Sequence, residues 1–363
     1  MAEPNARADS ATRKIKWLAI GIVVAVGLYA ALWAFLASRL DATAANAIAR
    51  AQAEGTSIEC AERDVRGFPF RLGLRCERTA VTLSDGTRAQ AGEFRSAAQV
   101  YDPGLVISEL DGPLALETTA GGGQLDWTNA RASTQFGLER LNLGTVRIED
   151  ATFDGVIDGS NVRAAIGRLL VSVRPNGPDL DAALTIDGFD AEPVGGRDAP
   201  PMDLRVDATV SGAAGAVAFQ SVPVESLRGR TVTLRALDLA LRGGGRLAAN
   251  GEVAVDGEGL PTGSIEVGFS DLAGMAEAVA AVAPEYGGPL RTVAGVLDGG
   301  GSGGFLSGQL GGGASNASAS ANAQTNGEGA VEADDGLTRA TIALDRGEAR
   351  LGVIPLGRVP PLP

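Results

Sequence analysis

The sequence predicts a mainly β protein, in which an N-terminal transmembrane helix and a helical stalk precede a long, curved antiparallel sheet with one or two short helices. The first observation is a single apolar segment of membrane length near the start of the chain. The second is a period of two in the apolar residues between positions 80 and 270, which is typical of half-buried antiparallel strands. The third is the recurrence of Asp-Gly pairs, which favour tight hairpin turns because both residues tolerate positive φ.

Composition excludes several classes of function. The net charge of -13 and the pI near 4.6 argue against nucleic acid as a partner, because phosphates require a basic surface. Histidine is absent, which removes His-based acid/base catalysis, His-containing triads and His-ligated metal sites. No lysine follows Lys16, so Schiff-base chemistry and a phosphate-loop lysine are also excluded from the large domain. We therefore expect a protein that is not an enzyme, with no catalytic residues, cofactor or metal; a hydrolase that uses carboxylates alone is the remaining enzymatic alternative.

The N-terminal region predicts a single-pass anchor in the inner membrane. Residues 1–16 form a short basic tail without periodicity, expected to be disordered and cytoplasmic, and residues 17–37 form the transmembrane helix. The cations before Trp17 favour a cytoplasmic N-terminus and a periplasmic C-terminal domain. A cleaved signal peptide is the competing interpretation, since Ala42-Thr43-Ala44 resembles a cleavage site, but an uncharged run of this length exceeds a typical signal core. Residues 38–55 are Ala-rich and should continue the helix outward as a stalk.

Both cysteines open the β-rich domain, which we expect over residues 56–298. In a translocated domain, Cys60 and Cys76 are expected to form a disulfide. The midpoint between them is Phe68, and a hairpin turning there would place the two sulfur atoms opposite each other. That register would also set Glu62 opposite Leu74 and Asp64 opposite Leu72.

The pattern of an N-terminal anchor, a Cys, Val-Arg-Gly-Phe-Pro-Phe-Arg and a second Cys is similar to a bacterial envelope family catalogued as domain of unknown function 2125. Two further stretches carry the resemblance, residues 251–263 (GEVAVDGEGLPTG) and residues 351–360 (LGVIPLGRVP). The resemblance implies an inner-membrane-anchored envelope protein and assigns no reaction. At the level of fold alone, the expected object is also similar to AsmA-like envelope proteins that handle lipid.

The remainder of the chain predicts few helices. Residues 271–282 read as a short helix capped by Ser270 or Asp271, and residues 289–297 as a second. Residues 299–336 are rich in Gly, Ser, Ala and Asn and are expected to be a flexible insertion. Residues 337–363 should form a final hairpin about Asp345-Arg346-Gly347 and a Pro-rich extended tail.

One motif is a candidate for a special role, with a structural and a functional interpretation. In the structural one, Pro69 stiffens the turn, Phe68 and Phe70 plug one end of the sheet, and Arg71 pairs with a carboxylate. In the functional one, the motif is a face at the membrane-proximal end of the sheet that docks on lipid or a membrane partner. The candidate residues are Arg66, Gly67, Phe68, Pro69, Phe70 and Arg71.

The sequence supports two further functional hypotheses besides the carboxylate hydrolase. One is a non-enzymatic protein that binds or handles lipid along an apolar sheet face, which needs a cover that few intramolecular helices are available to provide. The other is a scaffold or assembly factor for envelope machinery, recruiting a protein partner through a sheet edge or the insertion. The expected partners are therefore the inner membrane and either lipid or an envelope protein, and no nucleic acid.

Overall fold

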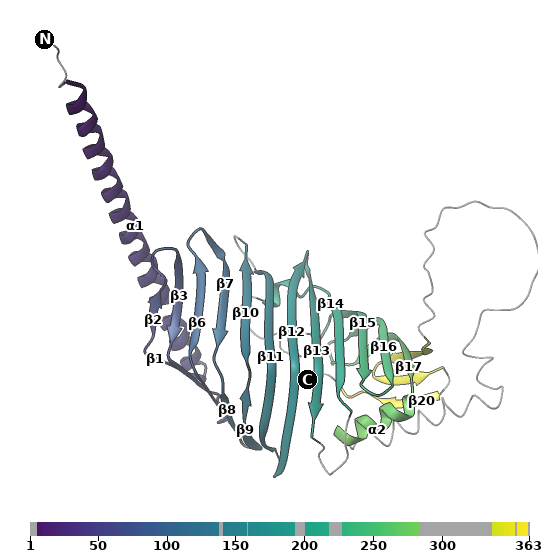
Figure 1. The fold of residues 1–363 in the computed structure, drawn as a ribbon. Coiled ribbons are helices and arrows are strands. Elements are labelled where there is room, and N and C mark those ends of the chain that lie inside the picture. The colour runs from purple at the N-terminus through teal and green to yellow at the C-terminus, as the bar shows by residue number, and fades with distance from the viewer. Residues whose placement is uncertain are drawn as a thin grey trace, which may run out of the picture.

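The computed structural model describes residues 6–137, 141–157, 159–192, 200–217, 227–282, 336–352 and 354–361. It consists of one long N-terminal helix and one large antiparallel sheet, whose strands stand side by side away from the helix (Figure 1). The predicted fold class is confirmed. The expected helix at 289–297 and nearly all of the expected insertion at 299–336 lie outside the described residues.

Helix α1 (Ala6–Ala53) runs without interruption through the segments expected as membrane helix and stalk. It begins within the segment expected to be a disordered tail, so residues 6–16 extend the helix instead; alanines and straight-chain cations in this stretch favour that conformation. Gly55 ends the helix with φ of 87°, and the Thr56 N–H donates to the Ala51 carbonyl at 2.8 Å. It is long and apolar enough to span a membrane.

The C-terminal half of α1, from Tyr29 onward, packs against strands β1 to β3 of the sheet. Half-buried or buried positions recur every three or four residues along one side of this part of the helix, as expected for a helix packed on one face. They are Tyr29, Ala30, Trp33, Ala37, Leu40, Asp41, Ala44, Ala45, Ile48 and Ala51.

The sheet contains twenty strands within the described residues, and all of them pair antiparallel. The first ten are β1 (Ser57–Ala61), β2 (Asp64–Arg66), β3 (Arg71–Cys76), β4 (Arg78–Thr82), β5 (Arg88–Ala91), β6 (Phe94–Gln99), β7 (Asp102–Leu110), β8 (Leu114–Thr118), β9 (Gly121–Asp126) and β10 (Asn129–Phe136). The others are β11 (Leu141–Ile157), β12 (Ser160–Asn176), β13 (Asp179–Ala191), β14 (Met202–Val210), β15 (Thr231–Leu241), β16 (Arg246–Val255), β17 (Pro261–Ser270), β18 (Thr338–Asp345), β19 (Glu348–Leu351) and β20 (Ile354–Arg358).

The sheet is a meander of long strands, and each of the first five is bent and therefore divided into two labelled strands. These pairs are β1 and β2, β3 and β4, β5 and β6, β7 and β8, and β9 and β10. Strands β1 and β2 together pair with β4 and β3, and β5 and β6 pair with β4 and β3 on the other side. In the same way, β7 and β8 pair with β6 and β5, and β10 and β9 pair with β7 and β8. The two halves of β11 then pair with β10 and β9. From β11 to β20 each strand pairs with the next.

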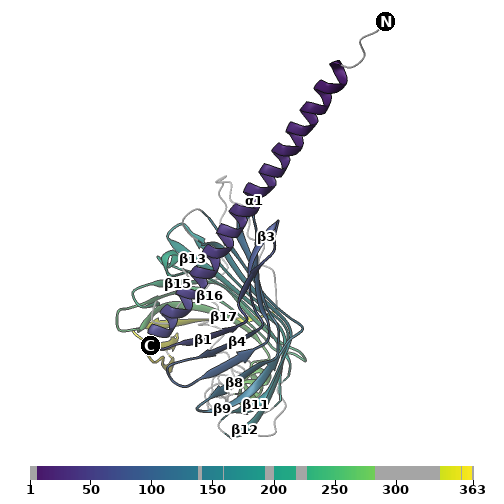
Figure 2. The same cartoon turned by 90° about the vertical axis from the view of Figure 1, so that its left-hand side faces the viewer.

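The interruptions in neighbouring strands line up and bend the sheet along one line. They fall at residues 62–63, 77, 92–93, 111–113, 127–128, 150, 167 and 188. Glu62 and Asp150 adopt positive φ at this line, as bulge residues do. Figure 2 shows the result, a strongly curved sheet seen from the end at which α1 lies.

The Asp-Gly pairs divide between turns and bends. Asp85-Gly86 and Asp256-Gly257 lie in hairpin turns, as predicted, whereas Asp158 lies outside the described residues. Asp111-Gly112 and Asp187-Gly188 mark the bend, and Asp154-Gly155 lies inside β11. A Cβ at Gly155 would lie 2.5 Å from the Gly122 carbonyl oxygen, so glycine serves close strand approach there.

The distal end of the sheet carries the small covering elements. Helix α2 (Leu272–Val282) confirms the predicted helix, and Asp271 caps it through the Gly274 N–H at 3.0 Å. Leu272 packs with Phe269, Ala340 and Leu351 in a small buried cluster. The final hairpin forms as predicted, but residues 354–358 of the expected tail form strand β20, where the missing N–H of Pro355 is tolerated because the strand lies at the sheet edge.

Candidate functional site: the concave apolar face and the β2–β3 turn

The register of the sheet separates apolar and polar side chains onto two continuous faces. Cross-strand partners share a face and successive residues alternate between faces, so the pairing assigns each side chain. One face, the inner face, is apolar from β3 to β18. Its apolar residues include Leu72, Leu74, Cys76, Phe94, Ala98, Val106, Leu110, Ala130, Ala132, Val146, Ile148, Leu169, Val171, Val173, Ala182, Leu184, Ile186, Leu204, Val206, Ala208, Val232, Leu234, Leu237, Leu239, Leu247, Ala249, Val253, Ile265, Val267, Phe269, Ala340 and Ile342. Four polar residues share the face: Ser96, Ser108, Thr134 and Thr338.

The opposite, outer face carries a lattice of ion pairs. Arg75 pairs with Glu93 at 2.7 Å and Arg95 with Asp111 at 2.9 Å. Further along the sheet, Arg168 pairs with Asp187, and Arg246 pairs with Asp238. This face is solvated and charged, while the inner face holds few polar groups.

The outer lattice is tightest around Asp181. Its Oδ2 accepts from Arg174 at 2.9 Å, and its Oδ1 accepts from Thr209 and Arg235, each at 2.8 Å. The Asp181 side chain is only 8% exposed. The Arg174 guanidinium, followed by that of Arg235, holds the pKa of this carboxyl well below its usual range.

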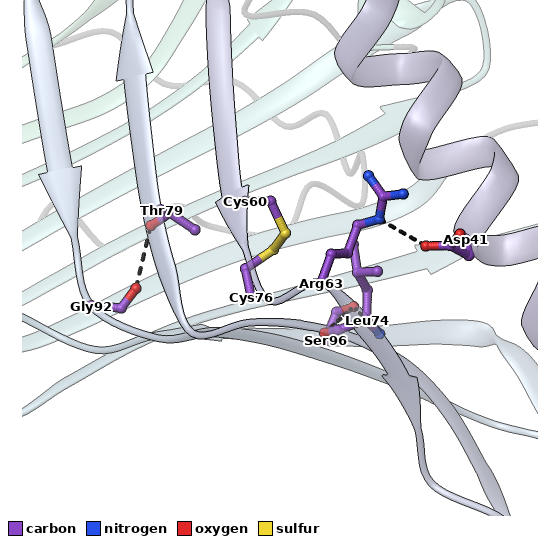
Figure 3. The surroundings of a disulfide bond; sticks show 8 residues. All are labelled: Asp41, Cys60, Arg63, Leu74, Cys76, Thr79, Gly92 and Ser96. Atoms are coloured by element: carbon purple, nitrogen blue, oxygen red, sulfur yellow. Dashed lines mark hydrogen bonds and ion pairs between the residues drawn. A yellow bond between two sulfur atoms is a disulfide. The ribbon is translucent and has the colours of Figure 1, made fainter.

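The disulfide between Cys60 and Cys76 is confirmed, and it shows which face is concave (Figure 3). Cys60 pairs with Thr79 in the ladder, and the same offset sets Cys76 opposite Arg63, three positions away. In a flat sheet that offset alone would separate the two cysteines by about 10 Å. Their Cα atoms are 5.1 Å apart, because the chain bends between them. Side chains converge only on the inside of a bend, so the apolar face is the concave one.

The predicted hairpin register is therefore wrong by three residues. Cys60 lies opposite Thr79 rather than opposite Cys76, and Asp64 lies opposite Arg75 rather than Leu72. Val65, not Glu62, faces Leu74. The real register joins unlike charges and apolar partners, and the bend at Glu62 brings the sulfur atoms together in spite of the offset.

The motif residues form the turn between β2 and β3. Arg66 ends β2 and pairs with Asp64, while Arg71 begins β3. Gly67 has φ of 118°, and a Cβ there would lie 2.7 Å from the Arg71 carbonyl oxygen, so the turn requires glycine. The Arg71 N–H donates to the Gly67 carbonyl at 2.8 Å, and the Phe68–Pro69 peptide bond is cis.

The turn packs against the helix rather than against the end of the sheet. The Phe68 ring lies edge-on to Trp33, with centroids 5.5 Å apart, and tilted against Tyr29 at 6.3 Å. The Tyr29 hydroxyl donates to the Pro69 carbonyl, and Trp33 Nε1 donates to the Arg71 carbonyl at 2.9 Å. Close by, Arg63 pairs with Asp41 of α1 at 2.7 Å (Figure 3).

Two details of the structural interpretation are not found. Arg71 makes no ion pair with a carboxylate among the described residues. Phe70 is 68% exposed, so it does not cover the end of the sheet. No signal in the sequence identifies Tyr29 and Trp33 as partners of the motif, because both lie in an apolar run that is typical of a membrane helix. Within the described part of the chain, no group of three or more acidic or cysteine side chains could hold a metal ion.

Comparison with known proteins places the chain in a family. Residues 33–360 match a family described as an uncharacterized protein conserved in bacteria (DUF2125). The chain belongs to this family. No curated protein and no solved structure matches it. The predicted family resemblance is thus confirmed from the end of the apolar segment to the Pro-rich terminus, and the function has to be argued from the site.

Proposed function

We propose that this protein is a non-enzymatic, membrane-anchored lipid-handling protein that holds acyl chains along the concave inner face of its sheet. In a Gram-negative cell, α1 anchors it in the inner membrane and the sheet lies in the periplasm. The observation that carries the proposal is the continuity of the apolar inner face across twelve consecutive strands, from β3 to β18, against an ion-paired outer face.

The size of this face supports a large apolar occupant. Strands in a sheet lie about 4.8 Å apart, so the inner face extends for roughly 50 Å across these strands. One leaflet of a bilayer is about 15 Å thick in its hydrocarbon part, so the face has room for whole acyl chains. Soluble proteins rarely expose apolar patches larger than a few hundred Å², and such a face calls for a cover.

The described chain covers the inner face only at its ends. At the near end, the one that begins with β1, the C-terminal half of α1 lies against β1 to β3. At the opposite, distal end, α2 and the final strands pack on Phe269 and Ala340. Between them, most inner-face side chains of β11 to β15 are only half-buried; Val146 is 42% exposed, and Leu180 at the end of β13 is buried. Acyl chains are the occupant we favour because the same helix that closes the near end also leads into the membrane.

The proposal is tested by measuring how much lipid remains bound to the full chain after purification. We expect native mass spectrometry of the detergent-extracted protein to show phospholipid adducts, and Leu184→Trp to reduce them because a large ring then occupies the middle of the inner face. Thr185→Trp is the matched control, because Thr185 is the neighbouring residue on the outer face. Lipid that merely surrounds α1 is equal in all variants and cancels in the comparison.

Two results would contradict the proposal. Equal lipid content in wild type, Leu184→Trp and Thr185→Trp would show that the inner face holds none. A stoichiometric protein partner crosslinked to this face would instead support the scaffold function. Val171→Trp provides a second inner-face variant if Leu184→Trp melts at a lower temperature than the control.

A further inference from the structure

We propose that the β2–β3 turn, Gly67 to Phe70, is inserted among the acyl chains of the membrane leaflet beside α1, where it joins the inner face of the sheet to the bilayer. The proposal rests on the membrane-spanning part of the proposed function, and it is independent of whether the sheet carries lipid. Three features of the turn carry it: its level along the helix, its exposed aromatic side chains and its hydrogen-bonded carbonyl groups.

The level of the turn is set by its contacts with α1. Leu36 is the last large apolar residue of the apolar segment, and Tyr29 and Trp33 lie seven and three residues before it. At 1.5 Å per residue these positions are about 10 Å and 4 Å inside the apolar boundary of a membrane spanned by this segment. The Phe68 ring contacts both side chains, so it lies at the same depth.

The aromatic side chains around the turn are exposed, which is unfavourable in water. Phe68 is 53% exposed in spite of its helix contacts, Phe70 is 68% exposed and Tyr101 is 77% exposed. Tyr101 belongs to the neighbouring β6–β7 turn, which is tied to this one because the Val100 N–H donates to the Phe70 carbonyl at 3.0 Å. Both turns thus present rings on the side of the sheet that α1 fixes towards the membrane, where aromatic residues are favoured.

Several carbonyl groups at the turn are hydrogen-bonded within the protein, as a medium without water requires. Hydrocarbon offers no hydrogen bonds, so polar backbone groups in the membrane need internal partners. The carbonyls of Gly67, Pro69, Phe70 and Arg71 accept from Arg71 N–H, Tyr29 hydroxyl, Val100 N–H and Trp33 Nε1, respectively. Pro69 has no N–H to satisfy. A turn in solvent would need none of these partners, and two of them come from the apolar segment itself.

The charges next to the turn fit the same placement. No charged residue occurs from Gly67 to Phe70, whereas Arg66 and Arg71 flank the turn and are exposed. Their long side chains reach the headgroup level, where cations meet anionic lipid. From Arg71 the inner face begins at once with Leu72 and Leu74, so apolar side chains continue from the turn into the concave face.

Photo-crosslinking of the full chain in vesicles of phosphatidylethanolamine and phosphatidylglycerol tests the insertion. Phe70→p-benzoylphenylalanine places the photoreactive group on a side chain that is exposed and makes few contacts. Leu83→p-benzoylphenylalanine is the matched control, because Leu83 is an exposed apolar residue of the β4–β5 turn, beyond the bend from the β2–β3 turn.

The expected result is phospholipid attached to position 70 through acyl-chain carbons, with about tenfold fewer adducts at position 83 because that turn lies outside the hydrocarbon. Equal yields at the two positions, or attachment to headgroups alone, would overturn the insertion. The same probe at Val171 separates the two proposals. Adducts at 171 without adducts at 70 would overturn the insertion and leave lipid handling intact, and the reverse pattern would do the opposite. An unchanged melting temperature verifies that each variant is folded.

Discussion

At the scale of single residues, Asp181 shows how the outer face is stabilised. Its carboxylate joins β12, β14 and β15 through Arg174, Thr209 and Arg235, and it is nearly removed from solvent. A buried carboxylate is tolerated only when it is paired and hydrogen-bonded, and removing its charge would leave the two guanidinium groups without their shared partner.

We expect Asp181→Asn to lower the free energy of unfolding by about 1–3 kcal/mol, as for other lost charge-assisted hydrogen bonds. Chemical denaturation at neutral pH measures this. Asp190→Asn is the control, because Asp190 is exposed on β13 and makes no ion pair among the described residues. Equal effects of the two changes would show that the hydrogen bonds of Asp181 do not stabilise the sheet.

The same residue predicts a pH dependence. The pKa of Asp181 is lowered in the folded state, so its stabilisation is complete above the unfolded value of about 3.9 and is lost as the pH falls from there towards the folded value. Wild type should therefore lose more stability than Asp181→Asn when the pH is lowered below about 4. Thermal unfolding measured across the acidic range checks the difference, and parallel acid profiles for the two proteins would contradict it.

At the scale of elements, the bend determines the curvature of the sheet. Each of the first strand pairs would be an ordinary hairpin if it were flat, and the bend turns the set into a curved wall with an apolar interior. The disulfide holds the first of these bends at the point where α1 also attaches, since Asp41 pairs with Arg63. Loss of the disulfide should therefore loosen both the bend and the near end of the inner face.

Replacing both cysteines by Ser should lower the stability of the sheet by about 3 kcal/mol, the value expected for a closed loop of this size. The melting temperature of the detergent-solubilised full chain measures the change. Reducing the wild-type disulfide should lower the melting temperature to the same value. If the double variant melts with wild type, the disulfide does not hold the bend.

At the scale of the whole molecule, the distribution of charge along the chain bears on the side of the membrane on which the sheet would lie. The first sixteen residues hold more cations than anions, and the rest of the chain carries the negative charge. Positive residues are enriched on the cytoplasmic side of membrane proteins, and we therefore propose that the sheet lies on the opposite side of the membrane from residues 1–16. In this proposed orientation the β2–β3 and β6–β7 turns meet the leaflet on the side of the sheet, and the β2–β3 turn enters it.

Protease added to spheroplasts of a Gram-negative host tests this orientation. An epitope at the C-terminus should be removed if the sheet lies outside, as proposed, whereas an epitope at the N-terminus should persist until the membrane is permeabilised. The outer face offers many arginines for trypsin. Protection of the C-terminal epitope in intact spheroplasts would reverse the assigned orientation.

The sequence alone determined the long apolar helix, the antiparallel sheet, α2 and the disulfide, because each depends on local signals: an apolar run, a period of two, a cap followed by small apolar residues, and two cysteines near the start of the β-rich domain. The alternation of Leu204, Val206 and Ala208 with Asp203, Arg205 and Asp207 even predicted the two faces. Bulges were not predictable: Ala236 reads as apolar face, but the bulge at β15 turns it outward, opposite Asp207.

Only the tertiary structure decided the register at the cysteines, the line of bends and the partners of Phe68. Each of these depends on residues far apart in the chain, such as Phe68 with Tyr29 and Trp33 or Asp64 with Arg75. A period of two fixes which residues share a face, but it sets neither the offset between strands nor the direction in which the sheet curves. Both depend on how the interruptions of neighbouring strands line up in the folded sheet, two of them at Glu62 and Asp150 with positive φ, which is why the concave apolar face emerged only from the folded chain.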